Sequence, residues 1–141
     1  MARKMHALLV DDEKTMLLFY RSALKKIGGE LDAMEASNGQ EGLRLLKMFT
    51  PDFVIVDCRM PVMDGPEFCK MARGLNFQVP IIMVTAEERF RVRDDLREND
   101  IYYLQKPIDM GDTFFCRRFE DELHKFVHGF LSRSSRTSII V

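Results

Sequence analysis

The sequence has almost no net charge, because 21 Lys and Arg residues face 22 Asp and Glu residues, which leaves a formal charge of −1. It therefore lacks the global basic field that would hold nucleic acid or an anionic membrane, and we expect neither as a partner of this domain. No apolar run approaches the roughly 18 residues that suggest a membrane span. We expect a soluble protein whose partners are recognised by a local site.

Cysteine is also scarce, with only Cys58, Cys69 and Cys116 in the chain. An odd number of cysteines without close pairing does not indicate a disulfide framework. The N-terminal stretch MARKMHALLVDDE reaches acidic residues before the apolar region of a signal peptide develops. A reducing cytoplasm is the predicted location, and 141 residues with 46% hydrophobic content suit one domain with its own core.

Short apolar runs alternate with segments of helical periodicity along the chain. The runs are apolar at successive positions, which is typical of strands buried on both faces of a parallel sheet. The predicted strands are 5–10, 30–36, 52–57, 79–85 and 101–105, and the predicted helices are 13–27, 38–50, 66–75, 87–99 and 115–130.

This order of strand and helix, repeated five times, predicts an α/β fold. Right-handed crossovers between parallel strands place helices on both faces of a single five-stranded, doubly wound sheet. Ligands of such sheets bind beyond the carboxyl ends of the strands, where the strand order reverses. The residues that follow each strand are therefore the first candidates for function.

Polar side chains occupy that position after four of the predicted strands: Asp11 and Asp12, Asp57, Thr85, and Lys106. The three carboxylates would repel one another, and in isolation one of them would take up a proton. A hard cation resolves this conflict, and oxygen ligands without His or Cys suit Mg²⁺. The pattern therefore predicts a magnesium site at this edge of the sheet.

The charges at this edge also suggest a reaction. Three carboxylates, one divalent cation and Lys106 sum to zero, so the site can accept a phosphoryl group. If Asp57 attacks phosphorus, its charge is replaced by about −2 on the phosphoryl oxygens, and the site retains a single negative charge. Mg²⁺ and a positioned lysine are the usual means of holding charge on a transferring phosphoryl group.

Four segments, LLVDDE, VIVDCRMPVMDG, IIMVTAEE and YYLQKPI, resemble in order the signature segments of the response-regulator receiver domain of two-component signalling. The resemblance implies a flavodoxin-like, CheY-like three-layer fold. It places the receiver domain at residues 4–128 and leaves 129–141 as an extension of the last helix and a frayed tail. Such a domain is a signalling module that catalyses its own phosphorylation and dephosphorylation, and not a turnover enzyme.

The resemblance also implies the roles of the acidic residues. Asp57 would be the phosphoacceptor and, with Asp12, a direct ligand of Mg²⁺ or Mn²⁺. Asp11 would act through a water molecule, and the main-chain carbonyl of Arg59 would complete the protein ligands. Cys58 and Arg59 are less usual after the phosphoacceptor, so their side chains could alter the lifetime of the phosphate.

The remaining roles concern the switch and the partners. Lys106 would contact the phosphoryl group, Thr85 would be the switch hydroxyl and Tyr103 the switch aromatic, although Tyr102 competes for that role.

A sensor histidine kinase or a histidine phosphotransfer protein would supply the phosphate to a stand-alone receiver or to one cut from a longer regulator. Its downstream partner is open, and a phosphorylation-dependent dimer is a further expectation.

Three other classes of protein share part of this pattern. A phosphatase of the haloacid dehalogenase type also uses a strand-end Asp with Mg²⁺, but it wants a second Asp where Arg59 stands. A flavodoxin needs a phosphate-binding loop after the first strand, where this chain has acidic residues. A degenerate receiver would lack site residues, and none is missing.

His124 and His128 have the spacing of metal ligands, but a solvated helix face is the favoured interpretation.

Overall fold

The computed structural model describes residues 4–86, 101–107 and 109–140, and the side chains of α5 as far as residue 132. Within these ranges, five strands and four helices follow one another along the chain. Their bounds are β1 Met5–Val10, α1 Lys14–Lys25, β2 Leu31–Ala36, α2 Gly39–Met48, β3 Phe53–Asp57, α3 Gly65–Gly74, β4 Ile81–Thr85, β5 Ile101–Gln105 and α5 Thr113–Ile140. The helix predicted over 87–99 lies outside the described residues.

The five strands form one parallel sheet in the order β2-β1-β3-β4-β5. The fold class predicted from the sequence is confirmed. The strand order reverses between β1 and β3, because the chain moves outward to β2 before it crosses back. The carboxyl ends of β1 and β3 therefore lie side by side at the point where ligands of such sheets bind.

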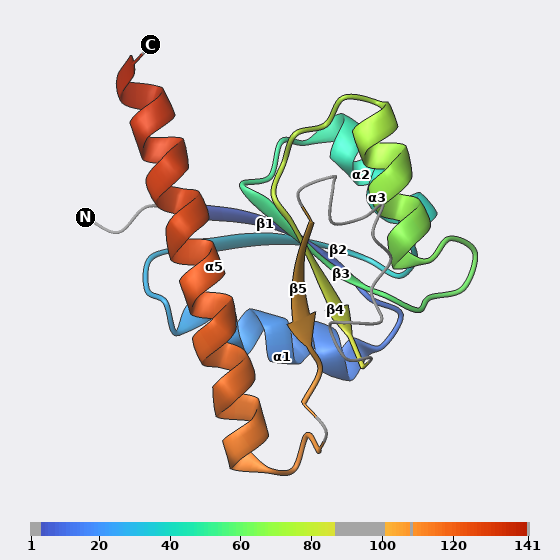
Figure 1. Ribbon diagram of the computed structural model, residues 1–141, viewed down its shortest axis with the longest axis vertical. Coiled ribbons are helices and arrows are strands. Elements are labelled where there is room, and N and C mark those ends of the chain that lie inside the picture. Colours follow the sequence, from blue (N-terminus) through green and yellow to red (C-terminus); the bar gives the residue numbers. More distant parts are fainter. Residues whose placement is uncertain (1–3, 87–100, 108, 141) are drawn as a thin grey trace.

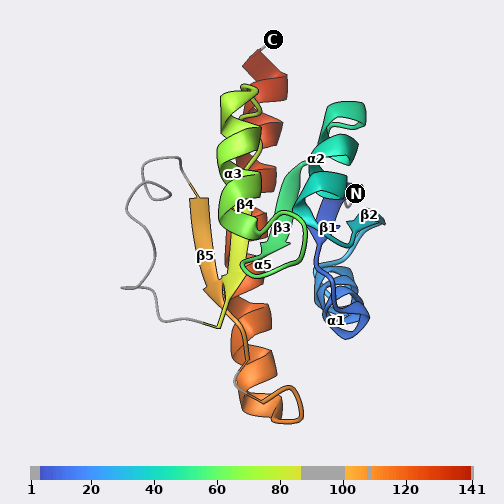
Figure 2. The ribbon, with the colours of Figure 1, turned by 90° about the vertical axis from the view of Figure 1, so that its right-hand side faces the viewer.

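Helices cover both faces of the sheet, with α1 and α5 on one face and α2 and α3 on the other (Figures 1 and 2). Successive strand residues alternate between these two layers, so Leu9 and Ile55 pack under α1 and α5 whereas Val10 and Val56 pack under α2 and α3. The phenylalanine stripe of α5 belongs to the first layer, since Phe119 and other residues at its spacing are buried. This face of α5 is therefore part of the core.

Capping side chains set the starts of α2 and α3. The side-chain amide oxygen Oδ1 of Asn38 accepts the Glu41 N–H at 2.9 Å, and the Asp64 carboxylate oxygen Oδ1 accepts the Glu67 N–H at 2.9 Å. The second cap begins α3 at Gly65, one residue before the predicted start. α2 ends at Met48, before Pro51 can interrupt it.

The last helix continues beyond the sheet as far as Ile140 (Figure 1). A Lys26 to Glu120 ion pair of 2.9 Å and a His124 Nε2 contact of 2.8 Å to the Ala23 carbonyl join it to α1. The division of the chain at residue 128 and the expected fraying of its end stay predictions. Among the described residues, no helix combines the length and apolar character needed to cross a membrane.

Candidate metal centre

The carboxyl edge of the sheet holds the buried polar side chains of the described part of the chain: Asp11, Asp57 and Thr85. Asp11 follows β1, Asp57 ends β3 and Thr85 ends β4. Carboxylate oxygens of Asp11, Asp12 and Asp57 all lie within 4.8 Å of one another. The residues predicted from the sequence are thus brought together by neighbouring strand ends.

Asp57 forms an ion pair with the lysine that follows β5, and Lys106 Nζ lies 2.9 Å from Asp57 Oδ1. Main-chain hydrogen bonds position both residues, because the Cys58 N–H donates to the Val84 carbonyl at 2.9 Å and the Lys106 N–H to the Thr85 carbonyl at 2.8 Å. Burial raises the pKa of Asp57 above its usual value, although the hydrogen bond and charge of Lys106 act to lower it. Burial acts to lower the pKa of Lys106, but the hydrogen bond and charge of Asp57, with the charges of Asp11 and Glu13, raise it above its usual value.

Asp11 is fully buried and accepts one hydrogen bond at each carboxylate oxygen. The Glu13 N–H donates to Oδ1 at 2.9 Å, and the Tyr20 hydroxyl donates to Oδ2 at 2.9 Å. Burial, together with the charge of Asp57, raises the pKa of Asp11 to about 6, while these two hydrogen bonds act to lower it. Burial and the Asp11 charge raise the pKa of Tyr20 well above its usual range, so its phenol keeps its proton.

The donor set fits a hard divalent cation. It consists of three carboxylates, two of them buried, and one of these would otherwise hold a proton below about pH 6. Oxygen ligands with few protein carboxylates are the coordination that Mg²⁺ prefers, and Asp12 is exposed, which leaves one side open to water. The ligand role of the Arg59 carbonyl, two residues after Asp57, stays a prediction.

The turn after Asp57 is closed by a glycine that comes very close to the strand. The Gly65 N–H donates to the Cys58 carbonyl at 3.0 Å, and a Cβ on Gly65 would stand 2.5 Å from the Asp57 carbonyl oxygen. Only glycine fits there without moving β3. Within the same turn, Val62 has a φ of 70°, a left-handed conformation that is strained for a β-branched residue.

The two switch candidates lie on the same face of the sheet. Thr85 lies two residues after Met83 and four after Ile81, so the three side chains share one face of β4. Ile81 and Met83 pack in the layer under α2 and α3 together with Tyr103. Tyr102 points to the opposite layer, where its ring centroid lies 5.0 Å from that of Phe130. The structure thus favours Tyr103 over Tyr102 as the neighbour of Thr85, whereas a switch role for either residue stays a prediction.

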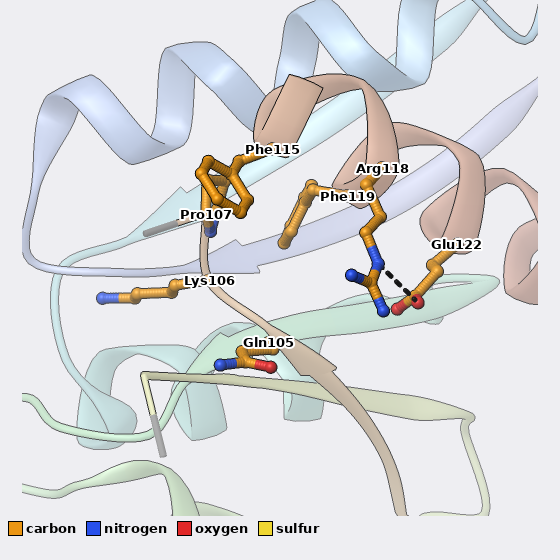
Figure 3. Close-up of a pocket in the computed structure, with 7 residues that line it drawn as sticks. All are labelled: Gln105, Lys106, Pro107, Phe115, Arg118, Phe119 and Glu122. Atoms are coloured by element: carbon orange, nitrogen blue, oxygen red, sulfur yellow. Dashed lines mark ion pairs between the residues drawn. The ribbon is translucent and has the colours of Figure 1, made fainter. Parts of the chain in front are cut away.

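A pocket of about 320 Å³ lies beside this site, between the β5 to α5 connection and α5. Figure 3 shows Lys106 at its border, with the side chain pointing away from Arg118 and Glu122. Those two residues form a 4.0 Å ion pair on α5. Lys106 thus lines the pocket, while its ammonium pairs with the Asp57 carboxylate.

Tyr20 lies in the helix predicted over 13–27, where its helical spacing with Leu17 and Leu24 is typical of a core residue. The structure buries its ring in the core, but the sequence did not predict its hydrogen bond to Asp11. A buried phenol usually has a hydrogen-bond partner, and this rule could have indicated a polar neighbour for the Tyr20 hydroxyl. The solvated helix face predicted for the two histidines is confirmed for His128, which is exposed, and is wrong for His124, which is half-buried and contacts the Ala23 carbonyl at 2.8 Å.

Comparison with known protein families decides what this arrangement belongs to. The sequence profile described as the response regulator receiver domain matches residues 7–114 of this chain. The chain belongs to the response-regulator receiver family. Receiver domains are signalling domains and not classical enzymes, so the dehalogenase-type phosphatase and flavodoxin alternatives are set aside.

Similar proteins agree with this membership. The receiver is 35% identical over 81 residues to the alkaline phosphatase synthesis transcriptional regulatory protein PhoP of Bacillus subtilis, a match that covers 57% of this chain and 33% of that protein. It is 41% identical over 90 residues to the two-component response regulator ORR41 of Oryza sativa subsp. japonica, covering 62% of this chain and 71% of that one.

A solved structure shows the same fold. The receiver domain of a Francisella response regulator superposes with a TM-score of 0.75 at 26% identity, and the superposition covers 92% of this chain and 98% of that one. The chain is therefore similar to an isolated receiver domain over nearly its whole length, but it spans only a third of PhoP. What longer relatives do as whole proteins does not carry over to this receiver directly.

Proposed function

We propose that this receiver accepts a phosphoryl group on Asp57, with Mg²⁺ bound at the same edge of the sheet. One observation carries the proposal: three carboxylates with oxygens within 4.8 Å lie beside a lysine that is 2.9 Å from Asp57. Such a cluster is unfavourable in a bare protein but suits a cation and a transferring phosphoryl group. Asp57 ends a buried strand, so its position as nucleophile is rigid.

In the proposed transfer, a carboxylate oxygen of Asp57 attacks the phosphorus of a phosphohistidine donor. The O–P bond forms as the N–P bond breaks, and the imidazole leaves with the bonding electron pair and then takes up a proton from water. Lys106 exchanges its bond to Asp57 Oδ1 for one to a phosphoryl oxygen, because its Nζ already stands next to the reacting carboxylate. A bound Mg²⁺ would supply positive charge to the transferring group.

The residues assigned to the metal are those implied by the family resemblance. Asp12 and Asp57 would bind Mg²⁺ directly, Asp11 would act through water, and the Arg59 carbonyl would be the fourth protein group. Mn²⁺ could take the place of Mg²⁺, since it also prefers oxygen ligands. Two of the carboxylates have raised pKa values, which supports the assignment because a cation would relieve that cost.

The response to phosphorylation is proposed to involve Thr85 and Tyr103, which share one face of the sheet. A charge-assisted hydrogen bond from Thr85 to a phosphoryl oxygen would contribute roughly 1.5–3 kcal/mol. A near-complete reversal of a two-state equilibrium takes about 5.5 kcal/mol. We therefore expect Lys106 or a bound partner to supply the remainder, or the population shift to be partial.

The phosphodonor is proposed to be a sensor histidine kinase or a histidine phosphotransfer protein in the cytoplasm. The similarity of this receiver to part of the sensor histidine kinase CheAY of Helicobacter pylori supports a kinase as partner. Phosphorylation would change the affinity for a downstream protein or output domain, or promote a dimer. These consequences are proposed separately from the chemistry at Asp57.

The test is incubation of the protein with acetyl phosphate, with Mg²⁺ or with EDTA, followed by mass spectrometry of the intact chain and of its peptides. We expect a Mg²⁺-dependent phosphoryl adduct on Asp57, formed as acetate leaves. Asp57→Asn should abolish it, while the matched Asp32→Asn change, at an exposed carboxylate of β2, should leave it intact. Undiminished incorporation in Asp57→Asn would disprove the assignment.

A further inference from the structure

A tyrosine of α1 reaches the candidate metal centre from inside the core. Tyr20 is fully buried, and its hydroxyl donates a 2.9 Å hydrogen bond to Asp11 Oδ2. Its ring stacks on Phe119 of α5, with centroids 6.1 Å apart and an angle of 22° between the planes. The ring is thus held between two helices while its polar end faces the site.

This contact fixes the second oxygen of Asp11. The Glu13 N–H already holds Oδ1 at 2.9 Å, so the two donors together define how the carboxylate is rotated. Each carboxylate oxygen has about two acceptor positions, so each keeps one for a metal-bound water or an ion. Asp11 can therefore bind an ion or a metal-bound water while both of its hydrogen bonds stay in place.

We propose that Tyr20 is a positioning residue of the metal centre: its hydroxyl, locked by Phe119, holds Asp11 in the orientation that faces Asp12 and Asp57. The inference rests on the proposed function, because it concerns the cation of that same site. The physical reason is preorganisation, since a carboxylate that is already oriented loses less freedom on binding. Hydrogen-bond partners behind a ligand commonly contribute about 10- to 100-fold to metal affinity.

The alternative is a phenol that merely satisfies its own buried hydroxyl. That role would affect the stability of the fold but not the affinity for the cation. The two roles are separable in Tyr20→Phe, which removes the hydroxyl and keeps the ring, its volume and its stacking on Phe119. Tyr102→Phe is the matched control, because Tyr102 packs in the same layer, among Phe126 and Phe130, near the start of β5.

The experiment measures the Mg²⁺ dissociation constant by isothermal calorimetry and by amide NMR shifts for the parent and both variants, after circular dichroism shows that each is folded. We expect binding to be about tenfold weaker in Tyr20→Phe and within about twofold of the parent in Tyr102→Phe. The rate of phosphorylation by acetyl phosphate should need about tenfold more Mg²⁺ for half-saturation in Tyr20→Phe and reach a plateau close to that of the parent.

An unchanged dissociation constant in Tyr20→Phe, with or without a lower melting temperature in EDTA, would overturn the inference and leave the proposed function standing. Equal weakening in both tyrosine variants would overturn it as well. A parent protein that binds no Mg²⁺ would instead overturn the proposed function, and the role of Tyr20 with it.

Discussion

The middle of the sheet and its carboxyl edge are built from the same strands but obey opposite rules. In the middle, Leu9, Ile55 and Ile82 are fully buried among apolar neighbours, with helices packed over both faces. Two residues after Leu9 and Ile55, the chain carries Asp11 and Asp57 into similarly buried positions, Asp11 directly after β1 and Asp57 at the end of β3. Apolar burial stabilises the fold, whereas carboxylate burial without a cation opposes it.

The difference supports the proposed binding role of this edge, because its buried carboxylates cost the folded protein free energy. Burial raises the pKa of Asp11 to about 6, which means that the folded protein holds this anion less readily than water does. A sheet selected for stability alone would end these strands with neutral residues. Clusters of perturbed carboxylates in this position are typical of functional sites.

The largest effect is expected from damage to the core. Phe53 is fully buried at the start of β3 and lies 6.4 Å from Phe130, so Phe53→Ala should lower the free energy of unfolding by about 3–5 kcal/mol through the cavity it leaves. The matched change is Phe114→Ala, at a side chain that is 66% exposed, and it should cost less than about 0.5 kcal/mol. Urea denaturation measures both, and equal losses would contradict the division into core and surface.

The second effect concerns pH in the absence of metal. The folded-state pKa of Asp11 is about 6, against 3.8 as its ordinary value, so the folded state binds this proton more tightly. The resulting stabilisation is fully present below about pH 4 and is lost as the pH rises through about 6; its upper limit is roughly 3 kcal/mol. Burial of Asp11 should therefore cost the folded protein the least free energy in acid, where its carboxyl group is protonated.

The measurement is urea denaturation between pH 4 and pH 7 in EDTA, for the parent and for Asp11→Asn. The variant removes this titration, so the parent should lose stability relative to it as the pH rises. At neutral pH, Asp11→Asn should be the more stable protein. A difference between the two that does not vary with pH would show that burial of Asp11 has no such cost.

The smallest effect concerns the turn beside the site. Val62 is 74% exposed and has a φ of 70°, so its β-branched side chain strains the backbone without packing in return. Val62→Asn should raise the free energy of unfolding by about 0.5–1 kcal/mol, because Asn tolerates the left-handed region. Val62→Ile keeps the branch and serves as the control; a gain of the same size in Val62→Ile would refute strain as the cause.

Much of the site could be predicted from the sequence, because strand order fixes which residues meet at a sheet edge. Asp57 and Lys106 are far apart in the chain, yet both follow parallel strands, and their 2.9 Å ion pair is what that rule implies. Successive side chains of a strand point to opposite faces of the sheet, so Tyr102 and Tyr103 lie on opposite faces. The register of β5 against β4 shows which of them shares a face with Thr85. The sequence alone left those two tyrosines in competition.

What the sequence did not predict depends on side-chain direction and on backbone strain. Tyr20 has the spacing of a core residue, and spacing does not say that its hydroxyl reaches Asp11. Val62 is a poor candidate for a left-handed residue, so no turn signal points to its conformation. In both cases the packed tertiary structure decides, and local preference does not.

The most direct test of the account compares the stabilising effect of Mg²⁺ on core and edge variants. At neutral pH and a Mg²⁺ concentration ten times the dissociation constant of the parent, binding should raise the free energy of unfolding of the parent by about 1.4 kcal/mol. Phe53→Ala should be much less stable yet keep this gain, whereas Asp11→Asn should be more stable in EDTA and lose most of it. A full Mg²⁺ gain in Asp11→Asn, or none in the parent, would contradict the account.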